Sequence, residues 1–285
     1  MISVVSVFYG EKESSAKCLL KSLEAQTASH ELILMDNTKD RFRSVAAALN
    51  EGGRKAKGKY IMFVHPDVDL ISSSWIGDAE KILDSAVNLG IAGVAGMSEE
   101  GRTNKERGRN VIKSIDKPWE WGNPIHRPEP VQTLDECLVV IPKCVFDRFK
   151  FDEETCDSWH LYAVDYCLSI RSEGLHAYAI PMYVHHRSEN SAGTKYMEDF
   201  FGYAGYRRRY YPTLVKVLKK HRGHAKRIYT TCGTWSTACP LALQRIYEMA
   251  FRAFYHLGVL LGLRFIWRVS GLKDIASKGS DRSSA

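Results

Sequence analysis

The chain has 285 residues, of which 45% are hydrophobic, and it carries a net charge of +7. These values exclude a disordered or low-complexity chain, because enough apolar residues are present for one large or two small folded domains. The seven cysteines are odd in number and form no CxxC pair, so we expect reduced thiols in a cytoplasmic protein.

Strand and helix patterns alternate along the first part of the chain. Apolar and β-branched runs predict strands at residues 2–8, 31–35, 60–64 and 91–96. Apolar residues at helical spacing predict helices that begin near Ser14 or Ser15, near Phe42 and near Ser72. No basic start or cleavage site precedes the first strand, so we expect no signal peptide. The order predicts an α/β fold, with a parallel sheet and helices on both faces.

The third predicted strand ends in a group of ionisable residues. Residues 60–64 are uniformly apolar, which is typical of a strand buried on both faces, and His65, Asp67 and Asp69 follow. Ligands bind at this edge of open α/β sheets, and paired carboxylates there favour a hard divalent cation. The alternative is that Asp67 and Asp69 only form a turn and cap the next helix.

The sequence lacks the glycine motifs that bind phosphate in other α/β proteins. Residues 90–96 contain three glycines, but their spacing does not match GxGxxG, and GxxxxGK[ST] is absent. The strand ends carry Tyr9 and Asp36 instead. An aromatic ring can stack on a base, and a carboxylate can accept a hydrogen bond from a base N–H. A nicotinamide-dependent oxidoreductase is therefore disfavoured.

A series of segments resembles the family 2 glycosyltransferases of the GT-A type. In chain order they are 4–9 (VVSVFY), 20–27 (LKSLEAQT), 31–38 (ELILMDNT), 46–52 (AAALNEG), 56–64 (AKGKYIMFV), 159–174 (WHLYAVDYCLSIRSEG) and 181–191 (PMYVHHRSENS). The resemblance covers residues 1 to about 195. It implies a GT-A fold, which is a Rossmann-like, mostly parallel sheet flanked by helices. It also implies sugar transfer from a nucleoside-diphosphate sugar, most simply of the UDP type.

The resemblance implies a donor site and a metal site. The residues expected to bind the nucleotide-sugar are Phe8, Tyr9, Asp36, Asn50, His65 and Asp67. The residues expected to hold Mn²⁺ or Mg²⁺ are Asp67, Asp69 and His186. The place of Asp69 in this set stays open, as does the choice between His185 and His186. Only one of these adjacent histidines can be a ligand, because neighbouring strand residues point to opposite faces.

The resemblance also implies a general base and an acceptor side. Asp165 matches the second acid of the family's Glu-Asp pair and would be the base, although Val164 stands where the Glu is expected. One base and a direct displacement would invert the anomeric carbon. Asp135 is the alternative base, and Asp165 could also be a helix-surface acid. The residues expected on the acceptor side are Asp135, Glu136, Trp159 and His160.

The last third of the chain has a different charge. Residues 201–285 contain 16 Lys and Arg against three acidic residues, a net charge of +13, whereas residues 1–200 carry −6 from 24 basic and 30 acidic residues. Residues 203–220 are basic and aromatic. Residues 241–269 are apolar, but their longest uncharged run is too short to span a bilayer. We expect docking on an anionic membrane surface at its cytoplasmic face, unless this segment packs on the catalytic domain.

These observations define the expected organisation and partners. Residues 1–195 would form the catalytic domain, with a nucleotide-binding half at 1–96 and an acceptor-side half at 97–195, followed by a helical, basic extension at 196–285. The acceptor would be a glycan or lipid-linked molecule of cell-surface polysaccharide synthesis. We expect no nucleic-acid partner, since no helix-turn-helix or RNP pattern is present, and a homo-oligomer stays open. The alternative function is a catalytically silent nucleotide-sugar-binding or scaffold subunit.

Overall fold

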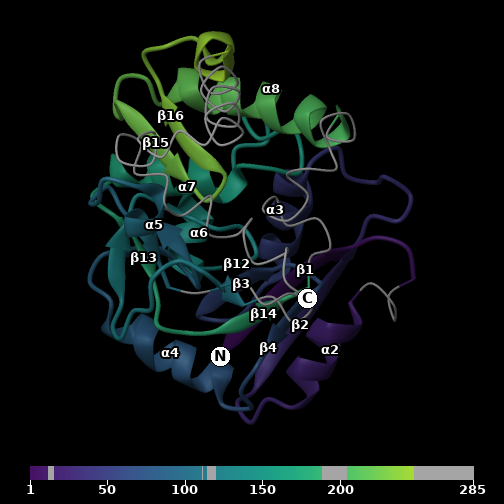
Figure 1. Ribbon diagram of the computed structural model, residues 1–285. Coiled ribbons are helices and arrows are strands. Elements are labelled where there is room, and N and C mark those ends of the chain that lie inside the picture. The colour runs from purple at the N-terminus through teal and green to yellow at the C-terminus, as the bar shows by residue number, and fades with distance from the viewer. Residues whose placement is uncertain (12–15, 111, 114–119, 188–203, 247–285) are drawn as a thin grey trace, which may run out of the picture. The chain divides into compact units, whose positions relative to one another are not determined.

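The computed structural model describes residues 1–11, 16–110, 112–113, 120–187 and 204–246 (Figure 1). One compact unit covers Met1–Thr237. The second unit, Ala238–Ala285, is described over 238–246, where residues 241–246 are helical. The boundary predicted at residue 195 lies outside the described residues, and the first compact unit continues beyond it. The region predicted as an extension therefore contributes elements to the first unit.

A seven-stranded sheet with the order β10-β13-β5-β12-β3-β1-β2 forms the centre of this unit. Its strands are β1 (Ile2–Phe8), β2 (His30–Asp36), β3 (Tyr60–Val64), β5 (Leu89–Gly93), β10 (Glu129–Val131), β12 (Leu138–Pro142) and β13 (His176–Ala179). β1 runs parallel to β2 and β3, whereas β12 is antiparallel to β3 and β5. The first three predicted strands are confirmed. The predicted fourth strand is divided, because β5 ends at Gly93 and β6 (Gly96–Met97) joins another sheet.

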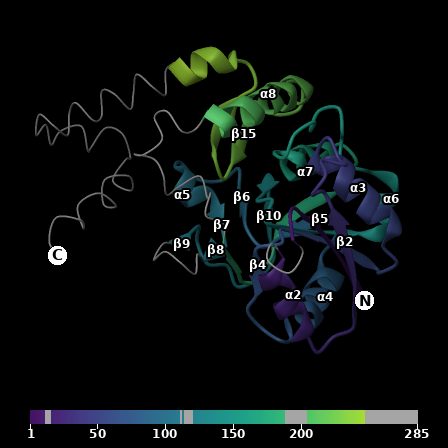
Figure 2. The ribbon, with the colours of Figure 1, turned by 90° about the vertical axis from the view of Figure 1, so that its right-hand side faces the viewer.

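Helices cover both faces of the sheet (Figures 1 and 2). One face carries α2 (Lys17–Glu24) and α4 (Trp75–Ser85), and the other carries α3 (Val45–Lys55), α6 (Lys143–Arg148) and α7 (Tyr162–Arg171). Strand alternation sends Ile61 and Phe63 into the core beneath α3, α6 and α7, and Met62 into the core beneath α2 and α4. β3 is therefore buried on both faces, as its apolar run predicts.

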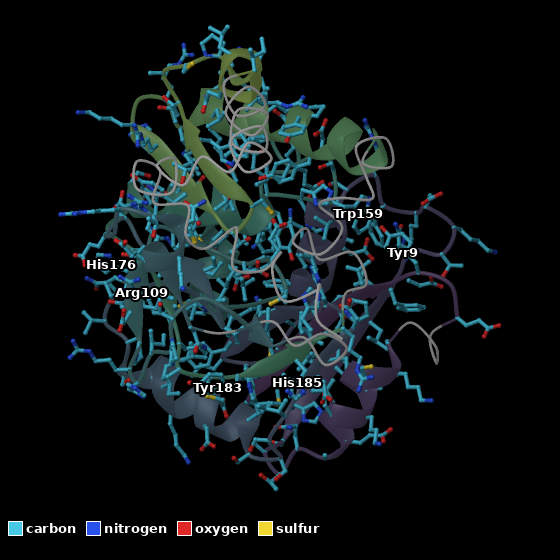
Figure 3. The ribbon with its side chains drawn as sticks, in the orientation of Figure 1. Tyr9, Arg109, Trp159, His176, Tyr183 and His185 are labelled. Carbon is cyan, nitrogen blue, oxygen red and sulfur yellow. The ribbon has the colours of Figure 1, made fainter. Side chains whose placement is uncertain are left out.

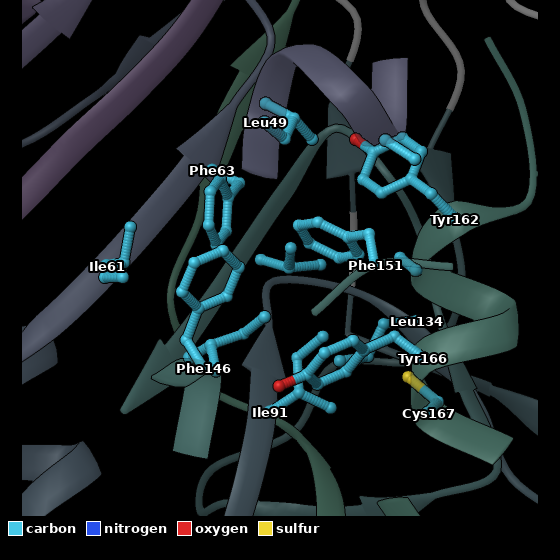
Figure 4. Close-up of a cluster of buried hydrophobic side chains, with 14 of the residues drawn as sticks. Leu49, Ile61, Phe63, Ile91, Leu134, Phe146, Phe151, Tyr162, Tyr166 and Cys167 are labelled. Carbon is cyan, nitrogen blue, oxygen red and sulfur yellow. The ribbon is translucent and has the colours of Figure 1, made fainter. Parts of the chain in front are cut away.

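The core beneath α3, α6 and α7 is rich in aromatic rings (Figure 4). The ring of Phe151 lies 5.0 Å from Phe63 and 5.3 Å from Tyr162, centroid to centroid, so it joins β3 to the start of α7. α3 approaches the sheet closely, because a Cβ at Gly52 would stand 2.4 Å from a methyl group of Val5. These contacts fix the positions of α3 and α7 relative to the strand ends.

Two smaller sheets and a helix border the edge where β3 ends. One sheet contains β4 (Val68–Leu70), β14 (Val184–His186), β8 (Ile112–Lys113) and β9 (Glu120–Trp121). The other contains β6, β7 (Gly108–Arg109) and β11 (Thr133–Leu134), with α5 (Asn104–Arg107) before β7. The antiparallel pairing of β14 with β4 aligns His186 with Val68. This pairing brings a residue from late in the chain next to the end of β3.

Helix α8 (Ala204–Lys220) and the hairpin of β15 (Arg227–Thr230) and β16 (Gly233–Ser236) belong to the first unit. Leu214 and Val217 of α8 are completely buried. Gln132 donates to the carbonyl of Arg227 and accepts from the N–H of Tyr229, which fixes the hairpin to the segment between β10 and β11. Among the described residues, no helix has the length and apolar content that a membrane crossing requires.

Candidate active site

Two imidazoles and one carboxylate converge at the end of β3. His186 Nε2 lies 3.2 Å from Asp67 Oδ1 and 3.4 Å from His65 Nδ1. One potential ligand atom from each residue lies within 4.8 Å of the others, and all three side chains are partly exposed. Imidazole nitrogen and carboxylate oxygen suit divalent transition metals such as Mn²⁺. His65, Asp67 and His186, which we call the metal trio, can therefore hold a divalent cation.

The protonation of the metal trio is set by burial and by its own charges. Burial lowers the pKa of His65 to about 4, assisted by the charge of His186. Burial alone would also lower the pKa of His186, but the hydrogen bond and charge of Asp67 outweigh it and raise that pKa. Burial would raise the pKa of Asp67, and the contact with His186 lowers it instead. These shifts favour a neutral imidazole at His65 and attraction between a protonated His186 and an ionised Asp67.

The structure distinguishes the trio from its neighbours on the same strands. Asp69 is aligned with His185, and Val68 with His186, across the antiparallel pair β4–β14. Since side chains alternate along a strand, Asp69 and His185 share a face that differs from that of His186. Asp69, which we expected as a third ligand, is not part of the metal trio. His65, which we assigned to the nucleotide, takes that place.

The ends of β1 and β2 present the groups expected at a nucleotide. Tyr9 is exposed, and its ring lies 4.9 Å from that of Trp159, at an interplanar angle of 67° (Figure 3). Asp36 is exposed and accepts a hydrogen bond from the N–H of Thr38, and the side chain of Thr38, followed by this N–H, lowers the pKa of Asp36. Asn37 is fully buried, and its amide nitrogen has no partner in the described part of the chain. Our sequence reasoning missed Asn37, although it follows a strand end directly after Asp36.

Two of the residues predicted at the donor site have structural roles instead. The side chain of Asn50 is 2% exposed, donates to the carbonyl of Phe151 and to Glu153, and accepts from the N–H of Phe151. Its amide is fully used in joining α3 to the loop after α6, so Asn50 is not available to a nucleotide. Phe8 is buried in β1, beside Asp36 in the register. Its side chain supports the strand end and is not presented as a stacking surface.

The loop between β11 and β12 brings two acidic residues to the metal trio. The carbonyl of Cys137 accepts from the N–H of His65, which attaches this loop to the end of β3. Asp135 is close enough for its charge to favour the protonated forms of both His65 and His186. Burial, assisted by the charge of Asp135, raises the pKa of Glu136 to about 8. The loop therefore places the charge of Asp135 near the metal trio and the carboxyl of Glu136 against the first turn of α7.

Asp165, the expected base, lies in a closed environment. It is 2% exposed, and its two oxygens contact Lys220 and His221 at 2.7 and 2.8 Å. It therefore differs both from a helix-surface acid and from a carboxylate that is open to an acceptor hydroxyl.

The aromatic residues expected at the acceptor are divided between two places. Trp159 contacts Tyr9 on the donor side. The ring of His160 lies 5.7 Å from that of Tyr210 in α8. The structure thus joins Trp159 to the residue that follows β1 and His160 to α8.

Comparisons with known proteins agree with this geometry. The model of the glycosyltransferase-like family matches residues 4–199. The chain resembles the mannosyltransferase PcManGT from Pyrobaculum calidifontis, solved in complex with GDP-Man and Mn²⁺, with a TM-score of 0.53, 15% identity, and coverage of 79% of this chain and 65% of that one. It also resembles GalNAc-T7, solved with UDP, GalNAc and Mn²⁺, with a TM-score of 0.50, 14% identity, and coverage of 66% and 44%.

A curated relative matches part of the chain. The protein "ATP synthase subunits region ORF 6" of Fuscovulum blasticum is 27% identical over 139 residues, which are 46% of this chain and 53% of that protein. The match therefore spans about half the length of the relative. The likeness to the two solved structures establishes the shared fold.

Proposed function

Because the chain belongs to the glycosyltransferase-like family, we propose that it moves a sugar from a nucleoside-diphosphate sugar to a hydroxyl group of a glycan or lipid-linked acceptor. The observation that carries this proposal is the metal trio at the end of β3, on the same sheet edge as Tyr9 and Asp36. Solved relatives in complex with GDP-Man or UDP and with Mn²⁺ support a donor of this class.

The donor would lie along the ends of β1, β2 and β3. The exposed ring of Tyr9 offers a stacking surface for the base, and the carboxylate of Asp36 accepts from a base N–H. The amide oxygen of Asn37 accepts from the N–H of Phe42, and its amide nitrogen lies buried behind this edge without a partner in the described part of the chain. His65, Asp67 and His186 would hold Mn²⁺ or Mg²⁺, which neutralises the charge of the leaving diphosphate when it is bound.

Asp135 is the carboxylate that the geometry favours as general base. It lies in the loop attached to His65, and its charge acts on the imidazoles of the trio. An ionised carboxylate in this place can take the proton of an acceptor hydroxyl as the oxygen attacks the anomeric carbon. With one base and a single displacement, the configuration would be inverted. Asp165 is a weaker candidate, because Lys220 and His221 engage both of its oxygens.

The position of the acceptor follows from the same loop. Asp135 and Glu136 would orient the attacking hydroxyl, and the ring of Trp159, beside Tyr9, would contact the sugar of the donor or acceptor.

Docking on an anionic membrane would bring a lipid-linked acceptor to this edge. Part of the charge predicted for docking is neutralised within the unit, since Lys216 pairs with Asp157 and Lys220 with Asp165. The residues 247–269 of the predicted apolar segment lie outside the described residues.

A panel of UDP- and GDP-sugars, each with and without Mn²⁺, tests the proposal on the whole protein. We expect one donor to raise the melting temperature only with Mn²⁺, because ligands that bind only the folded state stabilise it. The same donor should release its nucleoside diphosphate in the presence of an acceptor. Metal-dependent binding without any turnover would favour the alternative, a silent nucleotide-sugar-binding subunit. If no member of the panel bound with Mn²⁺, the proposed donor class would be wrong.

A further inference from the structure

The end of α8 holds a buried carboxylate of the catalytic fold. Lys220 Nζ lies 2.7 Å from Oδ2 of Asp165, and His221 Nε2 lies 2.8 Å from Oδ1. Lys220 also contacts Asp152 at 2.8 Å. The side chains of Asp165 and His221 are 2% and 4% exposed. This cluster joins α8 to α7, although its members are separated by about 55 positions in the sequence.

The first turn of α7, which contains Asp165, is attached to the loop beside the metal trio. Glu136 accepts a hydrogen bond from the backbone N–H of Ala163 at 3.3 Å, so it caps a helix that begins after an apolar residue. The hydroxyl of Tyr162 donates to the carbonyl of Glu136 at 2.8 Å. Asp135 directly precedes Glu136. A continuous series of contacts therefore runs from α8 through α7 to the carboxylate that we assign as base.

The backbone at the start of α7 is held in an unfavourable conformation. Leu161 has a φ of 69°, in the left-handed region, and is buried. A residue with a Cβ stays there only where its surroundings determine the conformation. The N–H of Asp165 donates to the carbonyl of Leu161 at 2.9 Å, and the carboxyl of Glu136 accepts from the N–H of Ala163 in the same turn. The turn is thus held by its own backbone hydrogen bond and by the side chain of Glu136.

We propose that the end of α8 is a positioning element of the active site, in which Lys220 and His221 hold Asp165 and thereby set the place of Asp135. The inference rests on the proposed function and adds residues that no local motif indicates. Lys220 and His221 do not touch the reacting groups, since they act through Asp165, α7 and Glu136. α8 would then be required for efficient transfer, independently of any membrane.

Steady-state kinetics on single and double variants separates positioning from direct catalysis. The variants are Asp165→Asn, Lys220→Met, His221→Leu and the pairwise combinations, and Lys216→Met, whose partner Asp157 is exposed, is the matched control. We expect kcat to fall roughly ten- to a hundredfold in each of the three single variants, because small misplacements of catalytic groups are costly. The donor KM and the pH–rate profile should be unchanged, because the trio and Asp135 are intact.

Non-additivity and conservative replacement are the diagnostic outcomes. If the three residues act as one unit, a double variant should lose little more than a single variant. His221→Gln, which keeps a nitrogen donor near the Nε2 position, should recover most of the lost kcat. A large loss in Asp165→Asn alone, with an altered pH–rate profile and near-normal Lys220→Met and His221→Leu, would overturn the proposal and make Asp165 the base. Normal kcat in all three folded single variants would also overturn it.

Amide hydrogen exchange tests the same inference without requiring turnover. We expect the N–H groups at 161–163 to exchange faster in Asp165→Asn and Lys220→Met than in Lys216→Met, since the capped turn would loosen. This readout distinguishes the failure of the inference from the failure of the proposed glycosyl transfer. Unchanged exchange at 161–163 in folded Asp165→Asn would show that α8 does not determine this turn. Urea titration first establishes that each variant is folded.

Discussion

Asp67 and Asp165 each lie against two nitrogen-bearing side chains, yet their surroundings differ. Asp67 faces His65 and His186 at a strand end, where all three side chains are partly exposed. Asp165 faces Lys220 and His221 between two helices, where almost no part of the carboxylate is exposed. The same kinds of group therefore form an open cluster at one place and a closed cluster at the other.

The two carboxylates differ in their suitability for a metal because their nitrogen-bearing neighbours differ in charge. Burial would lower the pKa of Lys220, but Asp165 and Asp152 raise it, so the ammonium keeps its charge beside Asp165. The pKa of His65 is about 4, so the metal trio contains a neutral imidazole with one nitrogen lone pair that can bind a cation. The ammonium of Lys220 makes the Asp165 cluster structural. The neutral imidazole of His65 and the open edge of the sheet make the Asp67 cluster suitable for a metal.

The strongest test of this contrast is removal of the trio's ligands beside matched controls. Asp67→Ala and His186→Ala should each lower turnover about a thousandfold or more and abolish metal-dependent nucleotide binding, because the leaving diphosphate loses its counter-charge. Asp69→Ala changes the acid two positions after Asp67, and His185→Ala changes the histidine next to His186. Asp69 and His185 share the strand face that differs from that of His186, so both variants should retain most activity. Calorimetry with Mn²⁺ and UDP or GDP measures binding. Equal losses in the two pairs would contradict the assignment of the trio.

A second test compares the two carboxylates as bases. Asp135→Asn should reduce kcat by roughly two orders of magnitude or more, because an amide cannot take the acceptor proton, while donor binding stays near normal. Asp165→Asn should lose less. Single-turnover kinetics at saturating donor separates chemistry from product release. Full activity in Asp135→Asn would require another base at this edge.

The strands and their polar ends could be predicted from the sequence because both depend on local pattern. The apolar run at 60–64 indicates a buried strand, and an acid at its end lies at the ligand-binding edge wherever the sheet is parallel. Asp67 and His186 were expected from the family resemblance, and the structure places them side by side. Their pairing depends on the alignment of β14 with β4, which no local pattern contains.

For Asn50 and Asp165, the structure differs from the roles that the sequence suggested for a related reason. Asn50 has a residue type and position that suit a nucleotide, but its amide is used by the backbone of Phe151, about 100 positions later. Asp165 is engaged by residues from a helix that we expected at a membrane surface. Partners supplied by distant segments decide whether a polar side chain is free, and sequence spacing does not show them. Asn37 had a usable signal, since it follows Asp36 at a strand end.

The closed cluster should matter more for stability than a surface pair of the same composition. Asp165→Asn should lower the free energy of unfolding by about 3 kcal/mol, because Lys220 and His221 would lose the charge of a buried partner. Asp157→Asn removes the exposed partner of Lys216 and should cost no more than about 1 kcal/mol. Urea titrations with unchanged m-values measure both. Equal effects would show that burial does not set the strength of the Asp165 cluster.

Glu136, which lies between the two clusters, should give a pH-dependent loss of stability. Its pKa of about 8 in the folded protein exceeds the ordinary value of 4.5, so the folded state binds more protons between these values and stability falls as pH rises through this window. Glu136→Gln has no proton to lose, so it should match the wild type below pH 4.5 and exceed its free energy of unfolding by about 4 kcal/mol near pH 8, as a pKa shift of this size implies. Urea titrations in EDTA exclude metal effects, and Glu24→Gln, an exposed change on α2, is the control. A difference between Glu136→Gln and wild type that stayed constant from pH 4 to 8 would show that the Glu136 carboxyl does not keep its proton in the folded protein.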